Sequence, residues 1–292
     1  MSSMALLQAD GCIWHEGEQA DNENATLMLG AKGLLCVEMD IRTASVDLPS
    51  EHGAIAPNAL WRLLWALNSL KDAREEVLVE GFYDNLVPAA DDMVEILRTM
   101  PDNAQALAQQ WGVKQMLSGL EGFQLHYTHL LIPTCTINGI SGSGMLEALS
   151  TSLSTVIPAQ ARARVDFHLV PDQDPHDIFA KLQCHLQAQG FGDVQVRMLY
   201  ACQPAYTPLA DPFVQMVRRA TTSAYEREPR ILPMTIGSHP IAPLRHLGMP
   251  VVITTGGALA QDSSARAKDF AAQIKQIALV IEEFAHGTDP VA

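Results

Sequence analysis

Two histidines that lie close together in the chain, His126 and His129, have the spacing of a pair of metal ligands. A structural zinc site takes four protein ligands, and no third ligand is evident beside this pair. The cysteines are odd in number, widely spaced and without a C-x-x-C pair, which predicts reduced, buried thiols rather than disulfides or a thiolate zinc site. They are Cys12, Cys36, Cys135, Cys184 and Cys202.

The sequence lacks several motifs that would indicate other chemistry. It has no G-x-S-x-G nucleophile elbow, no P-loop and no G-x-G-x-x-G at the start of a helix. The 19 basic and 33 acidic residues give a formal net charge of −14, which argues against nucleic acid as a partner. No stretch reaches the roughly 18 apolar residues of a membrane span, and the first residues do not resemble a signal peptide. We therefore expect a cytoplasmic protein that does not bind membranes.

The middle of the chain predicts an alternation of strands and helices that would position any site. The segment from Thr155 to Val170 alternates with period two, as a half-buried strand does. Asp174 as N-cap, Pro175 in the first turn and Gly190 at the end predict a helix between them. Further strands are expected at 34–43, 134–140 and 193–199, and a further helix begins near Pro57. This order is that of a split βαβ unit, which is an antiparallel sheet with two helices on one face.

Two other regions frame this unit. Residues 71–131 are expected to form an insertion, with helices near 92–100 and 104–120. The last third of the chain alternates helices with short apolar strands, which predicts part of a doubly wound α/β domain with a parallel sheet. With only two or three strands, such a sheet has exposed edges and resembles half of a domain.

Six short segments occur in the order and spacing of one enzyme family. They are Pro133 to Ile140, Thr155 to Ala159, His168 to Pro175, Gly237 to Ile241, Asp47 to Ser50 and Leu247 to Val251. Over roughly residues 8–285, the chain resembles the dimerising di-zinc amidohydrolases and metallopeptidases. These include acetylornithine deacetylase, succinyl-diaminopimelate desuccinylase, carnosinase and carboxypeptidase G.

The resemblance implies a catalytic α/β domain that is interrupted by a ferredoxin-like lid domain, through which two chains form a homodimer. We therefore expect a remnant of the catalytic-type domain at 1–33, the lid at 34–205 with its insertion at 71–131, and the rest of an incomplete catalytic-type domain at 206–292. In the family, two zinc ions and a general-base Glu activate water for attack on an amide carbonyl. A His from the lid of the partner chain stabilises the oxyanion, and an Arg or Asn/Thr from that lid with a Ser or Gly-rich loop holds the substrate carboxylate.

Three residues stand at family positions for substrate binding, and they are Thr155, His168 and Ser238. His168 replaces the Arg of the usual Arg-Leu-Val-Pro, so that an imidazole stands in place of a bidentate guanidinium. Thr155 retains a hydroxyl that can donate a hydrogen bond, and its alternative role is that of an ordinary strand threonine. The alternative role of Ser238 is to cap the following helix.

The catalytic positions depart further from the family pattern. Pro49 stands in place of the oxyanion His of Asp-Leu-His-Ser, and its side chain has no donor. Where the family has a zinc-binding Glu directly after a Trp, this chain has His15 and then Glu16, either of which is a candidate ligand. Their alternative role is that of loop residues without metal. The last zinc-binding His of the family is absent from 264–269, which contains two cationic residues instead.

The resemblance also places the family's His-x-Asp motif, bridging Asp and Glu-Glu pair before Met1. We therefore expect a homologue that lacks the N-terminal metal-binding half, binds no zinc or other cofactor, is not catalytic alone and dimerises. The alternative is a hydrolase subunit that cleaves amide bonds of N-acyl amino acids or dipeptides when a second polypeptide supplies the missing half.

Overall fold

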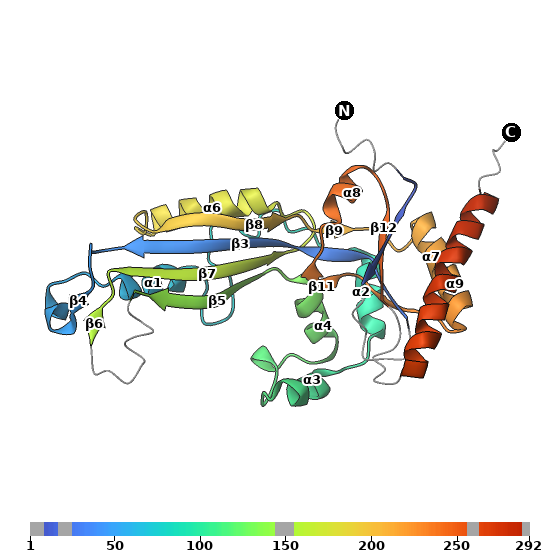
Figure 1. Ribbon diagram of the computed structural model, residues 1–292, viewed down its shortest axis with the longest axis horizontal. Coiled ribbons are helices and arrows are strands. Elements are labelled where there is room, and N and C mark those ends of the chain that lie inside the picture. Colours follow the sequence, from blue (N-terminus) through green and yellow to red (C-terminus); the bar gives the residue numbers. More distant parts are fainter. Residues whose placement is uncertain (1–8, 17–24, 144–154, 256–262, 288–292) are drawn as a thin grey trace. The chain divides into compact units, whose positions relative to one another are not determined.

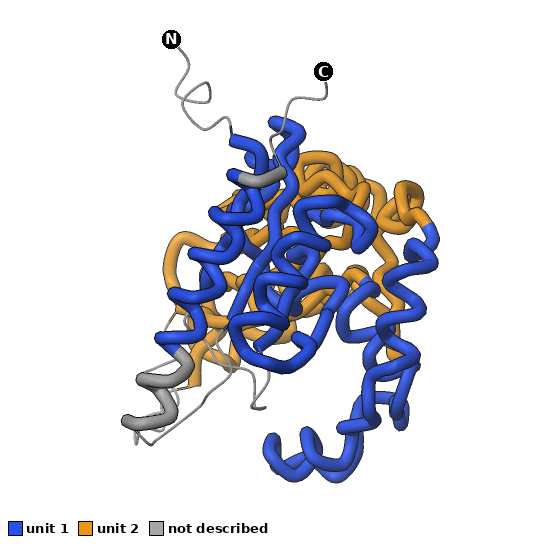
Figure 2. Tube along the Cα trace, turned by 90° about the vertical axis from the view of Figure 1, so that its right-hand side faces the viewer, with its two compact units in different colours: residues 1–32, 88–132, 205–292 blue, residues 33–87, 133–204 orange. Residues whose placement is uncertain are grey.

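The structure is a computed structural model that describes residues 9–16, 25–143, 155–255 and 263–287 (Figure 1). The chain forms two compact units, which Figure 2 shows in different colours. Unit 1 comprises residues 1–32, 88–132 and 205–292, and unit 2 comprises residues 33–87 and 133–204. The grouping differs from the expected insertion at 71–131, because residues 88–132 cluster with unit 1 rather than with the expected lid.

Unit 2 contains the predicted split βαβ fold. Its strands are β3 (Gly30–Arg42, from Gly33 onward in this unit), β5 (Thr134–Gly142), β7 (Gln160–Leu169) and β8 (Gln195–Cys202). They form an antiparallel sheet in the order β8-β3-β7-β5. Helices α1 (Ala59–Asn68) and α6 (Pro175–Ala188) share one apolar core with this sheet. The chain order β3-α1-β5-β7-α6-β8 confirms the fold that was expected of the lid.

Local sequence signals explain the elements of this unit. Along β7, Val165, Phe167 and Leu169 are buried, whereas the residues between them are partly or fully exposed. The Asp174 side chain caps α6 by accepting hydrogen bonds from the His176 and Asp177 amides at 2.7 and 3.2 Å. The predicted cap and the predicted period are therefore both confirmed.

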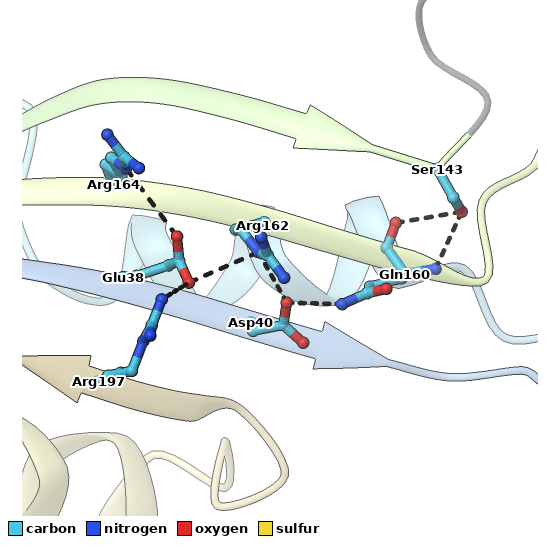
Figure 3. A network of polar contacts seen from close by, with 7 residues as sticks. All are labelled: Glu38, Asp40, Ser143, Gln160, Arg162, Arg164 and Arg197. Carbon is cyan, nitrogen blue, oxygen red and sulfur yellow. Dashed lines mark hydrogen bonds and ion pairs between the residues drawn. The ribbon is translucent and has the colours of Figure 1, made fainter.

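The sheet face opposite the helices carries a network of charges (Figure 3). Glu38 on β3 lies in register with Arg164 on β7 and Arg197 on β8. Its carboxylate is 2.8 Å from the Arg197 guanidinium and 3.7 Å from that of Arg162. Arg162 also binds Asp40, the next residue on this face of β3, at 2.9 Å. Opposite charges on neighbouring strands thus stabilise the register of this face.

The sheet of unit 1 has mixed strand directions. Its order is β1 (Cys12–Glu16), β12 (Val251–Thr255), β2 (Thr26–Met28) and β10 (Arg230–Leu232). β1 is parallel to β12 and β10 is parallel to β2, but β12 and β2 are antiparallel. The prediction of a parallel sheet is therefore wrong, because the short strand β2, which the sequence did not predict, enters the sheet antiparallel to β12.

Helices cover both faces of this sheet. One face packs against α7 (Pro212–Tyr225) and α9 (Ser263–Gly287), in a core that includes Leu27 and Val252. The other face packs against α8 (Ala242–His246) through Met28 and Ile253. In unit 1, β9 (Ala205–Tyr206) and β11 (Thr235–Ser238) pair with the first residues of β3.

Residues 88–132 contribute three helices to unit 1, α2 (Asp91–Thr99), α3 (Ala104–Trp111) and α4 (Gly122–Leu131). The predicted helix over 104–120 is wrong in its second half. Gly112 adopts a left-handed conformation with φ of 68° that ends α3. A short 3-10 turn, η3 (Leu117–Gly119), precedes α4, which packs against α2 and β11. None of the helices in the described ranges is both long and apolar enough to cross a membrane.

Candidate functional site

In unit 2, the structure places two of the family-like segments side by side. The short strand β4 (Leu48–Pro49) pairs with β6 (Val156–Ile157), so that Pro49 lies opposite Val156. The segments Asp47 to Ser50 and Thr155 to Ala159 are about a hundred residues apart in the chain, yet they form one small structure beyond the start of β7. We call these two segments and Ser143 the clasp.

Asp47 holds the clasp together. Its carboxylate accepts hydrogen bonds from the Ala159 amide at 2.8 Å and from the Ser143 hydroxyl. The Ala159 amide and then the Ser143 hydroxyl lower the pKa of Asp47, and partial burial opposes them. The ionised form is therefore the one that the folded protein stabilises.

Thr155 and Pro49 lie in the clasp. The hydroxyls of Thr155 and Ser50 are 2.7 Å apart, and the Ser50 amide donates to the Thr155 carbonyl at 3.1 Å. Thr155 is exposed and lies just before β6, so it is not part of the long strand predicted from Thr155 to Val170. Pro49 begins the short 3-10 helix η2 (Ser50–Ala54), whose His52 is exposed. The position expected to provide an oxyanion donor thus carries a side chain that can donate nothing.

His168 lies near the other end of β7. It is in register with Leu34 on β3 and Thr134 on β5. It lies eight positions after Gln160 at the start of the strand, which corresponds to about 26 Å of extended chain. Thr155 and His168, the two residues of this unit that are expected to bind substrate, are therefore far apart within one copy of unit 2.

The remaining candidates belong to unit 1. Ser238 is the last residue of β11, and α8 begins four residues later with Ile241 as its N-cap and no side-chain capping bond. The alternative role of Ser238 as a helix cap is therefore wrong. His15 lies on β1 beside Thr254 of β12, and its Nδ1 is 3.0 Å from the Thr254 hydroxyl. Glu16 ends β1 in register with Thr255.

The described residues do not form a metal centre by themselves. Within the described ranges, no three His, Cys, Asp or Glu side chains gather around a common point, and the His15 ring lies beside a threonine hydroxyl. His126 is buried on α4, with its Nε2 2.8 Å from the Pro101 carbonyl. Burial lowers the pKa of the neighbouring His129, and the positive charges of Lys32 and His126 lower it further.

Sequence reasoning did not find the clasp or the partners of these histidines. The Asp47 carboxylate and the Ala159 amide are 112 residues apart in the chain. A local sequence pattern does not predict a contact over such a distance. The sequence does carry a partial signal, because Asp47 to Ser50 and Thr155 to Ala159 both belong to the family pattern.

Comparison with known proteins identifies the family. Residues 29–193 match the model of the M20 peptidase dimerisation domain, which is more than half of the chain. The chain belongs to the M20 peptidase family. Its curated relatives include the Beta-Ala-His dipeptidase of Rattus norvegicus, with 25% identity over 218 residues, 70% of this chain and 42% of that enzyme. The Cys-Gly metallodipeptidase of Saccharomyces cerevisiae is 24% identical over 56% of this chain and 33% of that enzyme.

Solved structures of M20 proteins have the same fold. The M20 family metallo-carboxypeptidase from Sulfolobus solfataricus superposes with a TM-score of 0.85 at 26% identity, over 95% of this chain and 65% of that one. Human carnosine dipeptidase 1 gives a TM-score of 0.74 at 19% identity, over 92% of this chain and 59% of that one. This M20 protein therefore spans less than two thirds of the length of these relatives.

The clasp predicts a pH-dependent contribution to stability. Replacing Asp47 with Ala should lower the free energy of unfolding by about 1–2 kcal/mol at pH 7, because two hydrogen bonds to a carboxylate are lost. Since the folded-state pKa of Asp47 is lowered, the effect is present above the unfolded-state value near 4 and disappears as the pH falls through the folded-state pKa. Urea unfolding followed by circular dichroism at pH 7 and at pH 3 measures both effects.

The matched control is Asp10→Ala, which removes an exposed carboxylate before β1. If Asp47→Ala and Asp10→Ala unfold at the same urea concentration at pH 7, the clasp does not stabilise unit 2.

Proposed function

We propose that this chain is a non-hydrolytic M20 homologue that acts as a homodimer. The observation that carries the proposal is the place of Pro49 in the clasp. The family resemblance puts an oxyanion-stabilising His at this position, beside a hydroxyl-bearing residue that is retained as Thr155. Removing one oxyanion donor costs about 10²–10³ in rate, and Pro cannot replace it.

The other family positions support the same proposal. Zinc would supply a polarised carbonyl and an activated water if it were bound, but His15 faces a threonine hydroxyl and the described residues offer no ligand cluster. His168 cannot form the bidentate pair with a carboxylate that Arg forms. Each of these changes weakens a different part of amide hydrolysis, so a single compensating residue does not restore it.

The proposed dimer rests on unit 2. Thr155 and His168 lie at opposite ends of β7, so one chain cannot bring both to one substrate, whereas two chains can bring the clasp of one to the His168 end of the other. The name of the matched domain, peptidase dimerisation domain, describes such a role.

An apolar surface on unit 2 is available for this contact. The outer side of α1 exposes Trp61, Leu64 and Trp65, which are 56%, 38% and 55% exposed. The two Trp rings stack with their centroids 6.0 Å apart. Leu64 borders a groove that is also lined by Ile137 of β5, an edge strand of this sheet. An aromatic patch beside an unpaired strand edge fits a second copy of the same surface.

The second candidate function is that of a hydrolase subunit completed by another polypeptide. The observation that favours it is the retention of Thr155 and of Ser238, which is partly exposed at the end of β11. Such a complex would still lack the oxyanion donor at Pro49 and a His within 264–269.

The proposal of a non-hydrolytic protein makes a prediction about activity. The purified chain should show no metal-dependent hydrolysis of N-acetyl amino acids or dipeptides with added zinc, manganese or cobalt. The variant Pro49→His should be equally inactive, because an oxyanion donor contributes only when an activated water is present. A complete M20 dipeptidase under the same conditions is the positive control. Turnover that survives repurification and disappears in Glu16→Ala would contradict the proposal.

The proposal of a homodimer makes a prediction about assembly. Light scattering at micromolar concentration should give twice the chain mass of 31.8 kDa. Trp65→Glu should yield monomers, because it places a charge in the centre of the apolar patch. Trp111→Glu is the matched control, since Trp111 is 54% exposed on α3 in unit 1. A monomeric wild type, or a dimer that only Trp111→Glu disrupts, is incompatible with a dimer through unit 2.

A further inference from the structure

Unit 1 contains a cavity of about 410 Å³ among β2, β10, β12, β11 and the region of α3 and α4. This volume is within the range of small-molecule sites. The described residues of its lining include Arg230 and three histidines but no Asp or Glu. The described lining thus has basic and no acidic side chains, although the net charge of the chain is −14. The cavity therefore favours a negatively charged occupant.

Three hydrogen-bond donors form a row along one side of the cavity. Thr255 on β12 pairs in register with Thr26 on β2, and Thr26 pairs in register with Arg230 on β10. Side chains in register on neighbouring strands lie on the same face of a sheet, about 5 Å apart. All three residues line the cavity, so their polar groups form one continuous donor surface.

The two hydroxyls of this row have no hydrogen-bond partner among the residues that the structure describes. Thr26 is 2% exposed and Thr255 is 7% exposed, and neither Oγ1 atom has a hydrogen-bond partner. Buried polar groups in folded proteins are nearly always hydrogen-bonded. The Asn103 side-chain oxygen, also in the lining, is a third buried atom without a partner. The Asn103 oxygen is an acceptor and needs a donor, whereas the two threonine hydroxyls can donate to a ligand that accepts hydrogen bonds.

Arg230 completes the pattern. It is half-buried, and burial lowers the pKa of its guanidinium, with no acidic neighbour to oppose that effect. No ion pair or side-chain hydrogen bond joins Arg230 to any other residue in the described ranges. It is also the only Lys or Arg among the described lining residues, so the site matches a single negative charge.

The remainder of the lining is apolar. Met28 and Leu232 lie in register with each other, two residues beyond Thr26 and Arg230 on the same strands, and therefore on the same face. Leu107, Leu125 and Leu130 enclose the cavity from the side of α3 and α4. The donor row thus ends in an apolar compartment rather than in a second polar region.

We propose that this cavity binds a small monocarboxylate with an apolar chain. The carboxylate accepts hydrogen bonds from the Arg230 guanidinium and from the hydroxyls of Thr26 and Thr255. The chain packs against Met28 and Leu232. A planar guanidinium matches the two oxygens of a carboxylate, and a ligand with one charge leaves no unpaired charge in the cavity. The site belongs entirely to unit 1 and does not depend on whether the chain dimerises or hydrolyses amides.

Isothermal titration of the full chain with octanoate tests the proposal, and 1-octanol is the neutral probe with the same chain length. Octanoate should bind one per chain, at least about tenfold more tightly than 1-octanol, because only the acid pairs with Arg230. Arg230→Met should abolish this difference. Thr26→Val should weaken octanoate several-fold without destabilising the fold, since the hydroxyl that it removes has no partner among the described residues.

Arg219→Met is the matched control, because it makes the same charge change on the exposed side of α7, where Arg219 pairs with Glu283. It should leave octanoate binding unchanged. The proposal is overturned if octanoate fails to saturate at millimolar concentration, if octanoate and 1-octanol bind equally, or if Arg230→Met behaves like Arg219→Met. Should Arg230→Met fail to fold, unchanged octanoate affinity in Thr26→Val overturns it as well.

Discussion

The alternation of side chains along β3 is the constraint on which unit 2 depends. Leu35, Val37 and Met39 enter the apolar core beneath the helices, while Glu38 meets arginines of both neighbouring strands on the opposite face. A shift of one residue would place Glu38 in the core and Val37 among the arginines, so the register of β3 is strongly specified. The same register continues to the Thr43 amide, which donates to the Ala159 carbonyl at 2.9 Å and so positions the clasp.

Local sequence patterns were sufficient to predict most of unit 2. The period of β7 and the caps of α6 depend on residues within a few positions of one another, and the split βαβ order follows from them. Unit 1 was harder to predict, because β2 has only three residues and is buried throughout, so it shows no alternation. Its antiparallel pairing with β12 is a long-range contact that no short-range pattern encodes. The end of α3 depends on Gly112, whose left-handed conformation a helical period does not reveal.

Our proposal is that the site expected from the family resemblance is altered in several places rather than one. Pro49 lies in an ordered clasp, so the missing donor reflects a built structure and not an irregular loop. The Thr155 hydroxyl is hydrogen-bonded to the Ser50 hydroxyl, and the His15 ring is within hydrogen-bond distance of the Thr254 hydroxyl. The cavity residues Thr26, Thr255 and Arg230 were not found from the sequence, because each is unremarkable alone and only strand pairing brings them into one row. The proposed non-hydrolytic role and the proposed carboxylate site are separate proposals, because the first rests on unit 2 and the second on the cavity of unit 1.

The proposal that can be tested most directly is that this chain does not assemble the metal centre of its family. The most direct test is elemental analysis of protein purified without chelator and then dialysed against metal-free buffer. We predict no stoichiometric zinc, because His15 is engaged by a threonine hydroxyl and no three ligand side chains meet within the described residues. One or two tightly held zinc ions per chain would contradict the account.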